Sequence, residues 1–297
     1  DKELLHNLHE APKAKYYGPE FSETGTHLAF VTDEDTTKAQ VRPTRLYHWK
    51  DGMGKAELLA GPQPTSKDLR PSRYEDLSFS KDETRLFFGL ARPSVLRDTA
   101  LLDEEIVNVE VWTWDEPRLY TVQEMQVKND TTRGFAAVYH LPLGKMQQLA
   151  TGAYPDIQVG DEGNADHGLL STSNPYDLER QWTGRRARDY ALVDLEDGTK
   201  RKILTKVAGQ VDLSPKGQYV YGYNSLDSTW FAYNVNESAF KNLTKGTVFY
   251  NELHDSPSPP RPYGAAGWTE KDGDLILYDR YDLWKFDPDT GTSERLT

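Results

Sequence analysis

The 297-residue chain contains no cysteine. It therefore can hold no disulfide, no cysteine-ligated zinc or iron–sulfur cluster, and no thiolate nucleophile. It also lacks an apolar run near the ~20 residues of a transmembrane helix, and no signal-peptide-like apolar segment opens it. We expect no membrane segment. Because the chain begins with Asp1 rather than Met, we expect a processed or trimmed piece of a longer protein.

Sequence motifs for nucleophilic and phosphate chemistry are missing as well. No serine stands in a G-x-S-x-G elbow; Ser293 comes nearest, with Gly291 before it but Arg295 after it. Neither a P-loop nor a G-x-G-x-x-G pattern is present. We therefore predict no catalytic residue, no metal ligand and no cofactor in this chain.

Positive charge is scarce, since 35 Lys and Arg face 47 Asp and Glu and give a net charge of −12. This balance argues against a nucleic-acid partner, because phosphate contacts need clustered basic residues. Aromatic residues are plentiful, with 17 Tyr, 10 Phe and 7 Trp. Such large flat side chains are suited to filling a core between sheets.

Three groups of polar residues have some features of metal sites. His6 and His9 do not form an H-E-x-x-H motif, and a solvated terminus is the favoured interpretation. The acidic stretches 194–198 and 287–291 lack the distal Glu of an EF-hand and stand where a hairpin must turn. A cation at 161–168 stays open as an alternative to a blade-opening turn.

One phrase recurs along the chain: an apolar residue, a small polar turn, and a short alternating strand. Such a phrase indicates a tight turn leading into a β-strand. Its copies span 21–30, 79–88, 213–221 and, in degenerate form, 268–278.

A second phrase follows each copy and occurs once more, ending at residue 205: a strand, a turn that usually carries glycine, and a strand closing on Leu-Thr or Leu-Ala. It ends at residues 60, 150, 205, 244 and 297. Together the phrases describe a four-stranded antiparallel unit repeated every 40–75 residues, which is typical of β-propeller blades. A β-sandwich lacks such a fixed-order repeat. We predict an all-β propeller with units at 16–60, 74–150, 155–205, 209–244 and 245–297.

The predicted organisation leaves a few segments outside the blades. Residues 1–15 form a lead-in, in which Leu4, Leu5 and Leu8 have the spacing of one short helix. Residues 93–109 and 115–132 are expected excursions within the second unit.

Two segments carry candidate binding residues. Arg185, Arg186 and Arg188 stand close together after Trp182; they could face an acidic group or a peptide carboxylate, although an exposed loop of solvated arginines is favoured. Four prolines between 257 and 262 predict a stiff extended loop. Its flanks, Glu252, His254 and Asp255, face either a ligand or partner domain, or they only buttress the blade edge with His254 and Asp255 paired locally.

Parts of the chain resemble a known family. The stretch His254-Asp255-x-Pro-x-Pro-Pro-x-Pro-Tyr263-Gly264-x-Ala-Gly-Trp268-Thr269, followed by 277–288, is similar to the propeller of bacterial prolyl-oligopeptidase-like serine peptidases, most of all the Bacteroidetes type. Segments 111–119 and 137–141 are similar to the same group. The resemblance implies a propeller that caps a following α/β-hydrolase domain, restricts access to short peptides, and lies in the periplasm or outside the cell.

These observations give one main expectation and two alternatives. The chain is expected to be a gating propeller, inactive alone, whose partners are a C-terminal hydrolase domain absent from this sequence and a peptide substrate. A stand-alone TolB-like or WD-like propeller that binds a protein or ligand is the first alternative, and a propeller enzyme with a convergent acid/base pair is the second. If five units leave the ring open, we expect self-association. The candidate substrate- or domain-interface residues are Glu252, His254, Asp255, Tyr263, Arg280, Arg185 and Arg186.

Overall fold

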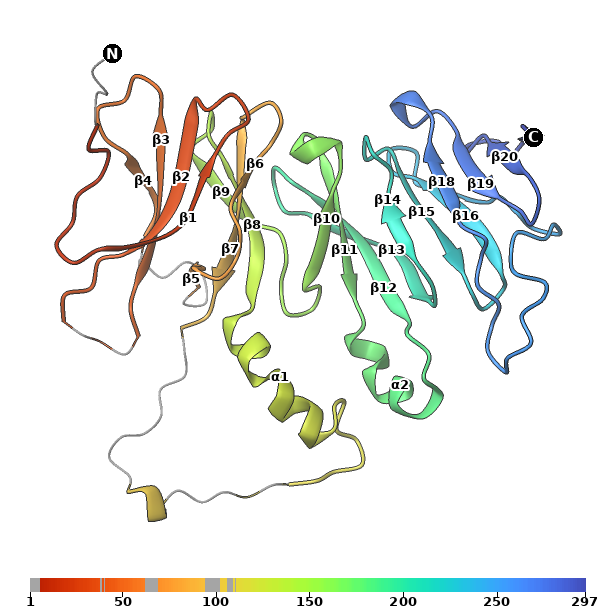
Figure 1. Ribbon diagram of the computed structural model, residues 1–297, viewed down its shortest axis with the longest axis horizontal. Coiled ribbons are helices and arrows are strands. Elements are labelled where there is room, and N and C mark those ends of the chain that lie inside the picture. Colours follow the sequence, from red (N-terminus) through yellow and green to blue (C-terminus); the bar gives the residue numbers. More distant parts are fainter. Residues whose placement is uncertain are drawn as a thin grey trace. The chain divides into compact units, whose positions relative to one another are not determined.

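The computed structural model describes residues 6–37, 39, 41–61, 69–93, 102–105, 109 and 111–297. It divides into two compact units, Asp1–Gly152 and Ala153–Thr297. Each unit consists of antiparallel sheets whose strands follow one another in chain order (Figure 1). This arrangement is the one expected when each alternating segment pairs with the next across a short turn.

The first unit opens with a four-stranded sheet. Every residue of its second strand is buried, so this strand lies at the centre of the unit. The strands are β1 (Lys15–Phe21), β2 (His27–Asp33), β3 (Thr44–Lys50) and β4 (Glu57–Ala60).

The second sheet of this unit has a divided first strand. Two short segments, β5 (Arg70–Pro71) and β6 (Ser78–Phe79), pair with different parts of the same edge of β7 (Arg85–Ala91). The sheet continues with β8 (Gly134–His140) and β9 (Lys145–Gln148).

The connection between β7 and β8 contains η1 (Asp103–Glu105) and α1 (Tyr120–Thr132), within the regions expected to be excursions. Helix α1 has no buried residue, and it extends beyond the end of β8 in Figure 1. Other residues of the 93–109 excursion lie outside the described part of the chain.

The second unit contains three four-stranded sheets. The first has a helical excursion between its middle strands, made of η3 (Asn174–Tyr176) and α2 (Asp177–Thr183), which the sequence did not lead us to expect. Short 3-10 turns, η2 (Asp161–Gly163) and η4 (Glu270–Asp272), precede the second strands of the first and third sheets.

The strands of the three sheets are β10 (Asp156–Val159), β11 (His167–Thr172), β12 (Arg188–Asp194) and β13 (Lys200–Val207); β14 (Val211–Leu213), β15 (Tyr219–Asn224), β16 (Thr229–Asn234) and β17 (Ala239–Asn242); and β18 (Ala265–Trp268), β19 (Leu275–Tyr278), β20 (Leu283–Phe286) and β21 (Ser293–Arg295).

The first recurring phrase of the sequence forms the same turn in four sheets. A serine or threonine hydroxyl accepts the N–H of the residue five positions later, in Ser22, Ser80, Ser214 and Thr269. The residue three positions after that hydroxyl has a positive φ: 75° at Gly25, 58° at Glu83, 76° at Gly217 and 56° at Asp272. Glycine adopts this conformation without steric cost. This explains why two of the four turns carry glycine at this position.

Apolar side chains form separate cores in the two units. The first unit buries Leu46, Leu86 and Leu90 in one cluster. The second unit has two clusters, one around Leu169 and Leu192 and one around Leu275 and Leu277. Alternating strands that bury one face against a neighbouring sheet explain this pattern. The predicted fold class is confirmed: the chain is all-β, built of five blade-type sheets of the β-propeller class.

The lead-in differs from its expectation. Residues 6–14 contain no helix, whereas Leu4 and Leu5 lie outside the described residues. The Leu8 carbonyl instead accepts the N–H of Ala56 at 2.8 Å. The prediction of a solvated His9 is wrong: its side chain is 11% exposed, and its ring packs 4.3 Å from that of Tyr47. Neighbouring aromatic rings therefore hold this segment on the first sheet.

The acidic stretches behave mainly as turns. Asp194 and Asp287 each accept two N–H groups from the residues just after them. Asp161, in the 161–168 stretch, pairs with the Lys216 ammonium. Within the described ranges, no three His, Asp or Glu side chains gather as a metal site, and no helix has the length and apolar character needed to cross a bilayer.

Candidate functional site

A cavity of about 860 Å³ lies within the second unit. Its walls come from four stretches far apart in sequence: the end of α2 and the residues after it, the β13–β14 connection, strands β15 and β16, and the proline-rich loop before β18. These stretches lie at the ends of strands, where loops can vary without disturbing the sheet core.

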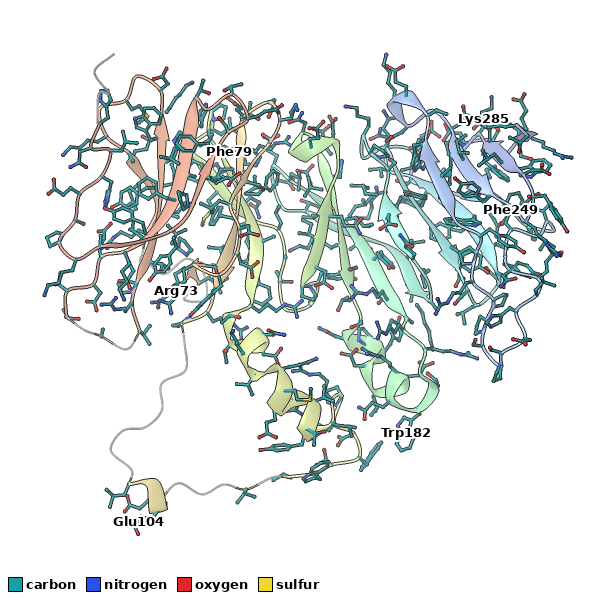
Figure 2. The ribbon with its side chains drawn as sticks, in the orientation of Figure 1. Arg73, Phe79, Glu104, Trp182, Phe249 and Lys285 are labelled. Carbon is teal, nitrogen blue, oxygen red and sulfur yellow. The ribbon has the colours of Figure 1, made fainter. Side chains whose placement is uncertain are left out.

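Arg185 and Arg186 enter the cavity wall directly after α2. The helix ends at Thr183, and the N–H of Gly184 bonds to the Arg180 carbonyl. Two residues further on, Arg188 binds Asp156 at 2.6 Å and Ser171 at 2.8 Å. The backbone is thus fixed on both sides of Arg185 and Arg186, while their own side chains are exposed. Figure 2 shows Trp182 at the outer tip of α2, where it is 81% exposed.

The proline-rich loop forms the opposite wall and is tied to the sheet at two points. The Tyr223 hydroxyl donates to the Pro260 carbonyl at 3.0 Å. The Asn251 N–H donates to the Arg261 carbonyl at 2.9 Å, beside an isolated bridge between Tyr250 and Pro262. Proline fixes φ on each side of Arg261, so the position of this arginine is well defined before any ligand binds.

The floor of the cavity is aromatic. Tyr221, Tyr223 and Trp230 line it, and Trp230 is only 5% exposed. Burial raises the pKa of both tyrosines, so their hydroxyls remain protonated at neutral pH. Gly209 completes the floor, because a Cβ there would lie 2.0 Å from the Tyr223 carbonyl oxygen. Only glycine allows this close backbone approach.

The charge lining the cavity is mainly positive. Arg185, Arg186 and Arg261 face a single carboxylate, Asp212. Two amide side chains bind that carboxylate, from Gln210 at 2.6 Å and Gln158 at 3.3 Å. The cavity therefore has a positive excess although the chain as a whole is strongly negative.

The other candidate residues from the sequence lie outside this cavity. Glu252 is 4.0 Å from Arg280, and the Arg280 guanidinium stacks 5.1 Å from the Tyr281 ring centroid. Tyr263 donates its backbone N–H to the Phe249 carbonyl at 3.3 Å. Asp255 is exposed. Of the seven candidates, the structure thus brings Arg185 and Arg186 together with the proline-rich loop, while Glu252 and Arg280 form a separate pair.

His254 makes a local contact rather than a pair with Asp255. Its Nε2 lies 2.9 Å from the Ser258 hydroxyl, which is a serine–histidine hydrogen bond within one loop. A catalytic pair of this kind needs a third group that orients the histidine. Among the described residues, no carboxylate bonds to the His254 ring. The geometry therefore gives no support to an autonomous hydrolase at this loop.

Sequence reasoning missed several residues of the site: Gly209, Asp212, Tyr221, Tyr223, Trp230 and Arg261. Arg261 carried a usable signal, since it is the one charged residue inside the proline run. The aromatic residues carried none, because they belong to alternating strands that look like ordinary core positions.

Comparisons with known proteins show no family for the chain. No model of a known protein family matches it, and no curated protein matches it. Solved structures that are similar include TolB from Acinetobacter baumannii, with 9% identity and a TM-score of 0.34 over 95% of this chain and 54% of that chain. The β-propeller domain of the Trilobed protease from Pyrococcus furiosus has 12% identity and a TM-score of 0.38, over 95% of this chain and 71% of that chain. Porphyromonas gingivalis dipeptidyl peptidase 4 has 12% identity and a TM-score of 0.39, over 94% of this chain and 45% of that chain.

The chain therefore spans about half the length of the TolB protein and less than half of the dipeptidyl peptidase. The similar solved structures include both peptidase propeller domains and TolB proteins.

Proposed function

We propose that the chain is the propeller portion of a bacterial prolyl-oligopeptidase-like serine peptidase of the Bacteroidetes type, which admits and positions short peptides without hydrolysing them. The cavity is the observation that supports this proposal. Arg185, Arg186 and the proline-rich loop, which the sequence marks as unusual, line one space of about 860 Å³. Ligand sites commonly have volumes of roughly 300–1,000 Å³, which suits a peptide of a few residues.

In this proposal the hydrolytic chemistry belongs to another domain. The resemblance of residues 252–288 to the peptidase propellers implies an α/β-hydrolase domain with a serine, an aspartate and a histidine. The propeller would then contribute selection by size and by contact with the peptide. The same resemblance implies a location in the periplasm or outside the cell.

The test combines the gene with an activity assay. We expect the gene to encode a G-x-S-x-G motif downstream of this chain. The intact protein should cleave alanyl-prolyl p-nitroanilide and react with a serine-directed phosphonate, whereas residues 1–297 alone should do neither. The matched control is the intact protein with its G-x-S-x-G serine changed to alanine, which should lose both responses.

Two results would contradict the proposal. A stop codon soon after Thr297 would favour a stand-alone propeller of the TolB-like or WD-like kind. Phosphonate-sensitive turnover by residues 1–297 alone would instead mean that the chain carries its own nucleophile.

A further inference from the structure

The arginines of the cavity differ from most other arginines of the second unit. Arg188, Arg280 and Arg295 each face a carboxylate, and Arg201 bonds to Ser238 and to a carbonyl. Among the residues that the structure describes, four guanidinium groups of this unit make neither a hydrogen bond nor an ion pair: Arg180, Arg185, Arg186 and Arg261. Three of these four line the cavity, and only Arg180 does not.

Three arginines of this acidic chain line one cavity without a partner. The cavity therefore favours a negatively charged ligand. A net charge of −12 provides many carboxylates. Among the described residues, however, the only one lining the cavity is Asp212, which two amides already bind. Guanidinium groups bind carboxylates through parallel hydrogen bonds, and these are stronger than neutral ones. The three guanidinium groups of the cavity can therefore bind an anion supplied from outside the chain.

The cavity also provides apolar and hydrogen-bonding surface beyond charge. Tyr221 and Trp230 line it with aromatic rings, and Ser225 and Ser258 line it with hydroxyl groups. Aromatic rings pack against apolar side chains, and hydroxyl groups form hydrogen bonds with backbone groups. A peptide that also carries a carboxylate therefore matches both this surface and the arginines.

We infer that this cavity binds an oligopeptide through a carboxylate held by Arg185, Arg186 and Arg261. The identity of the ligand as a peptide rests on the proposed function, whereas the preference for a carboxylate rests on the arginines. The carboxylate could be the C-terminus of the peptide or an acidic side chain. Asp212 would repel a second carboxylate placed beside it, so we expect one anionic group per bound peptide.

The test measures binding of three synthetic peptides to the full 297-residue chain by calorimetry at pH 7.5 and low salt. The first is acetyl-Ala-Ala-Pro-Ala with a free C-terminal carboxylate, the second is its amide, and the third is the amide of acetyl-Ala-Glu-Pro-Ala. We expect the first or the third to bind about tenfold or more tightly than the second, because removing the charge removes a charge-assisted hydrogen bond. The peptide that binds identifies the source of the carboxylate.

Variants then locate the site. Changing Arg185 and Arg186 together to Gln, or Arg261 to Gln, should weaken the preferred peptide about tenfold and reduce the salt dependence of its affinity. Arg180→Gln is the matched control, because Arg180 is equally unpaired but lies outside the cavity, and it should bind as the wild type does. Far-UV circular dichroism checks that each variant remains folded.

Several outcomes would overturn the inference: no binding of any peptide, equal binding of all three peptides, or equal weakening by Arg180→Gln. Tighter binding of inorganic phosphate than of either peptide acid would mean a general anion site rather than a carboxylate site. Because the assay needs no hydrolysis, its result is independent of whether a hydrolase domain exists. A failure of this binding test would therefore leave the proposed peptidase function standing. A failure of the peptidase test would likewise leave the carboxylate preference of the cavity standing.

Discussion

Two histidines form a direct pair inside the first sheet. His27 Nδ1 lies 2.7 Å from His48 Nε2, and the rings stack with centroids 5.0 Å apart. Burial lowers the pKa of both side chains below the usual histidine value. Glu83 lies 3.9 Å from His27 and Glu57 lies 3.5 Å from His48; these carboxylates oppose the shift, while Lys50 adds to it.

This pair predicts that acidification destabilises the first unit. Because the pKa of each ring is lowered, the folded protein takes up these protons at a lower pH than the unfolded chain, whose histidines titrate near pH 6.5. The unfolded state therefore binds more protons, and the free energy of unfolding falls as the pH is lowered from about 6.5. We expect a lower melting temperature at pH 5.5 than at pH 7.5, measured by circular dichroism.

The variant His48→Gln should remove most of this pH dependence, whereas His254→Gln, in the exposed proline-rich loop, should keep it. Equal melting temperatures at the two pH values would contradict the prediction. Glu83 does not interfere in this window, because hydrogen bonds from Thr24 and Thr26 lower its pKa to about 2. The stabilising effect of Glu83 is present above its unfolded pKa of ~4.3 and is lost as the pH falls toward 2.

The recurring turn of the sheets also joins neighbouring sheets. In the first unit, Glu83 accepts hydrogen bonds from Thr24 and Thr26 of the preceding sheet. In the second unit, Asp272 accepts from the Ser214 hydroxyl at 2.5 Å and from the N–H groups of Lys216 and Gln218. An acidic residue at the positive-φ position thus binds the corresponding turn of the sheet before it.

Asp272 gives a test of this contact. Asp272 is 2% exposed, so water cannot replace its carboxylate. Asp272→Ala therefore leaves the Ser214 hydroxyl and two N–H groups without their acceptor. We expect a loss of about 3 kcal/mol in the free energy of unfolding, measured by urea denaturation. Asp272→Asn keeps an acceptor and tolerates positive φ, so its loss should be smaller. Equal stability of Asp272→Ala and the wild type would contradict this account.

The turns of the sheets could be predicted from the sequence, whereas the divided strand and helix α2 could not. The turns are predictable because Ser80 or Ser214 and the residue three positions later impose one backbone geometry on each copy. The divided strand β5–β6 is not, because its break depends on contacts with β7. Helix α2 had local signals, Pro175 near its start and Gly184 after its end, but its seven residues are too few for a clear apolar periodicity.

The candidate site was less predictable than the fold. Arg185 and the prolines stand out locally, so composition identifies them. Their meeting depends on strands of different sheets, and Tyr221 and Trp230 are indistinguishable from core residues until the chain is folded. Local patterns specify the sheets, whereas the cavity is a product of tertiary packing.

At the scale of the whole molecule, the two units have independent cores. The cluster around Leu46 and Leu86 belongs entirely to the first unit, and the clusters around Leu192 and Leu277 belong to the second. Units with separate cores can unfold separately, which departs from two-state behaviour.

We therefore expect two thermal transitions in differential scanning calorimetry. Lowering the pH to 5.5 should shift mainly one of them, since the His27–His48 pair lies in the first unit. Asp272→Ala should shift mainly the other one, since its contacts lie in the second. A single transition, or a shift of the same transition by both changes, would show that the units unfold as one.

The contact between two glycines in the second unit has a consequence for how such repeats can be exchanged. A Cβ on Gly160 would lie 2.9 Å from the Gly217 nitrogen, and one on Gly217 would lie 3.0 Å from the Ala165 Cβ. The corresponding Gly25 of the first sheet has open space around it, and Glu83 of the second sheet carries a full side chain. Replacing residues 214–217 of the fourth sheet with the 80–83 turn would place a glutamate where Gly217 lies. That side chain would force Gly160 and Ala165 away. The repeats look alike in sequence, yet they are not interchangeable modules, and recombination among them is restricted to exchanges that keep a glycine at this contact.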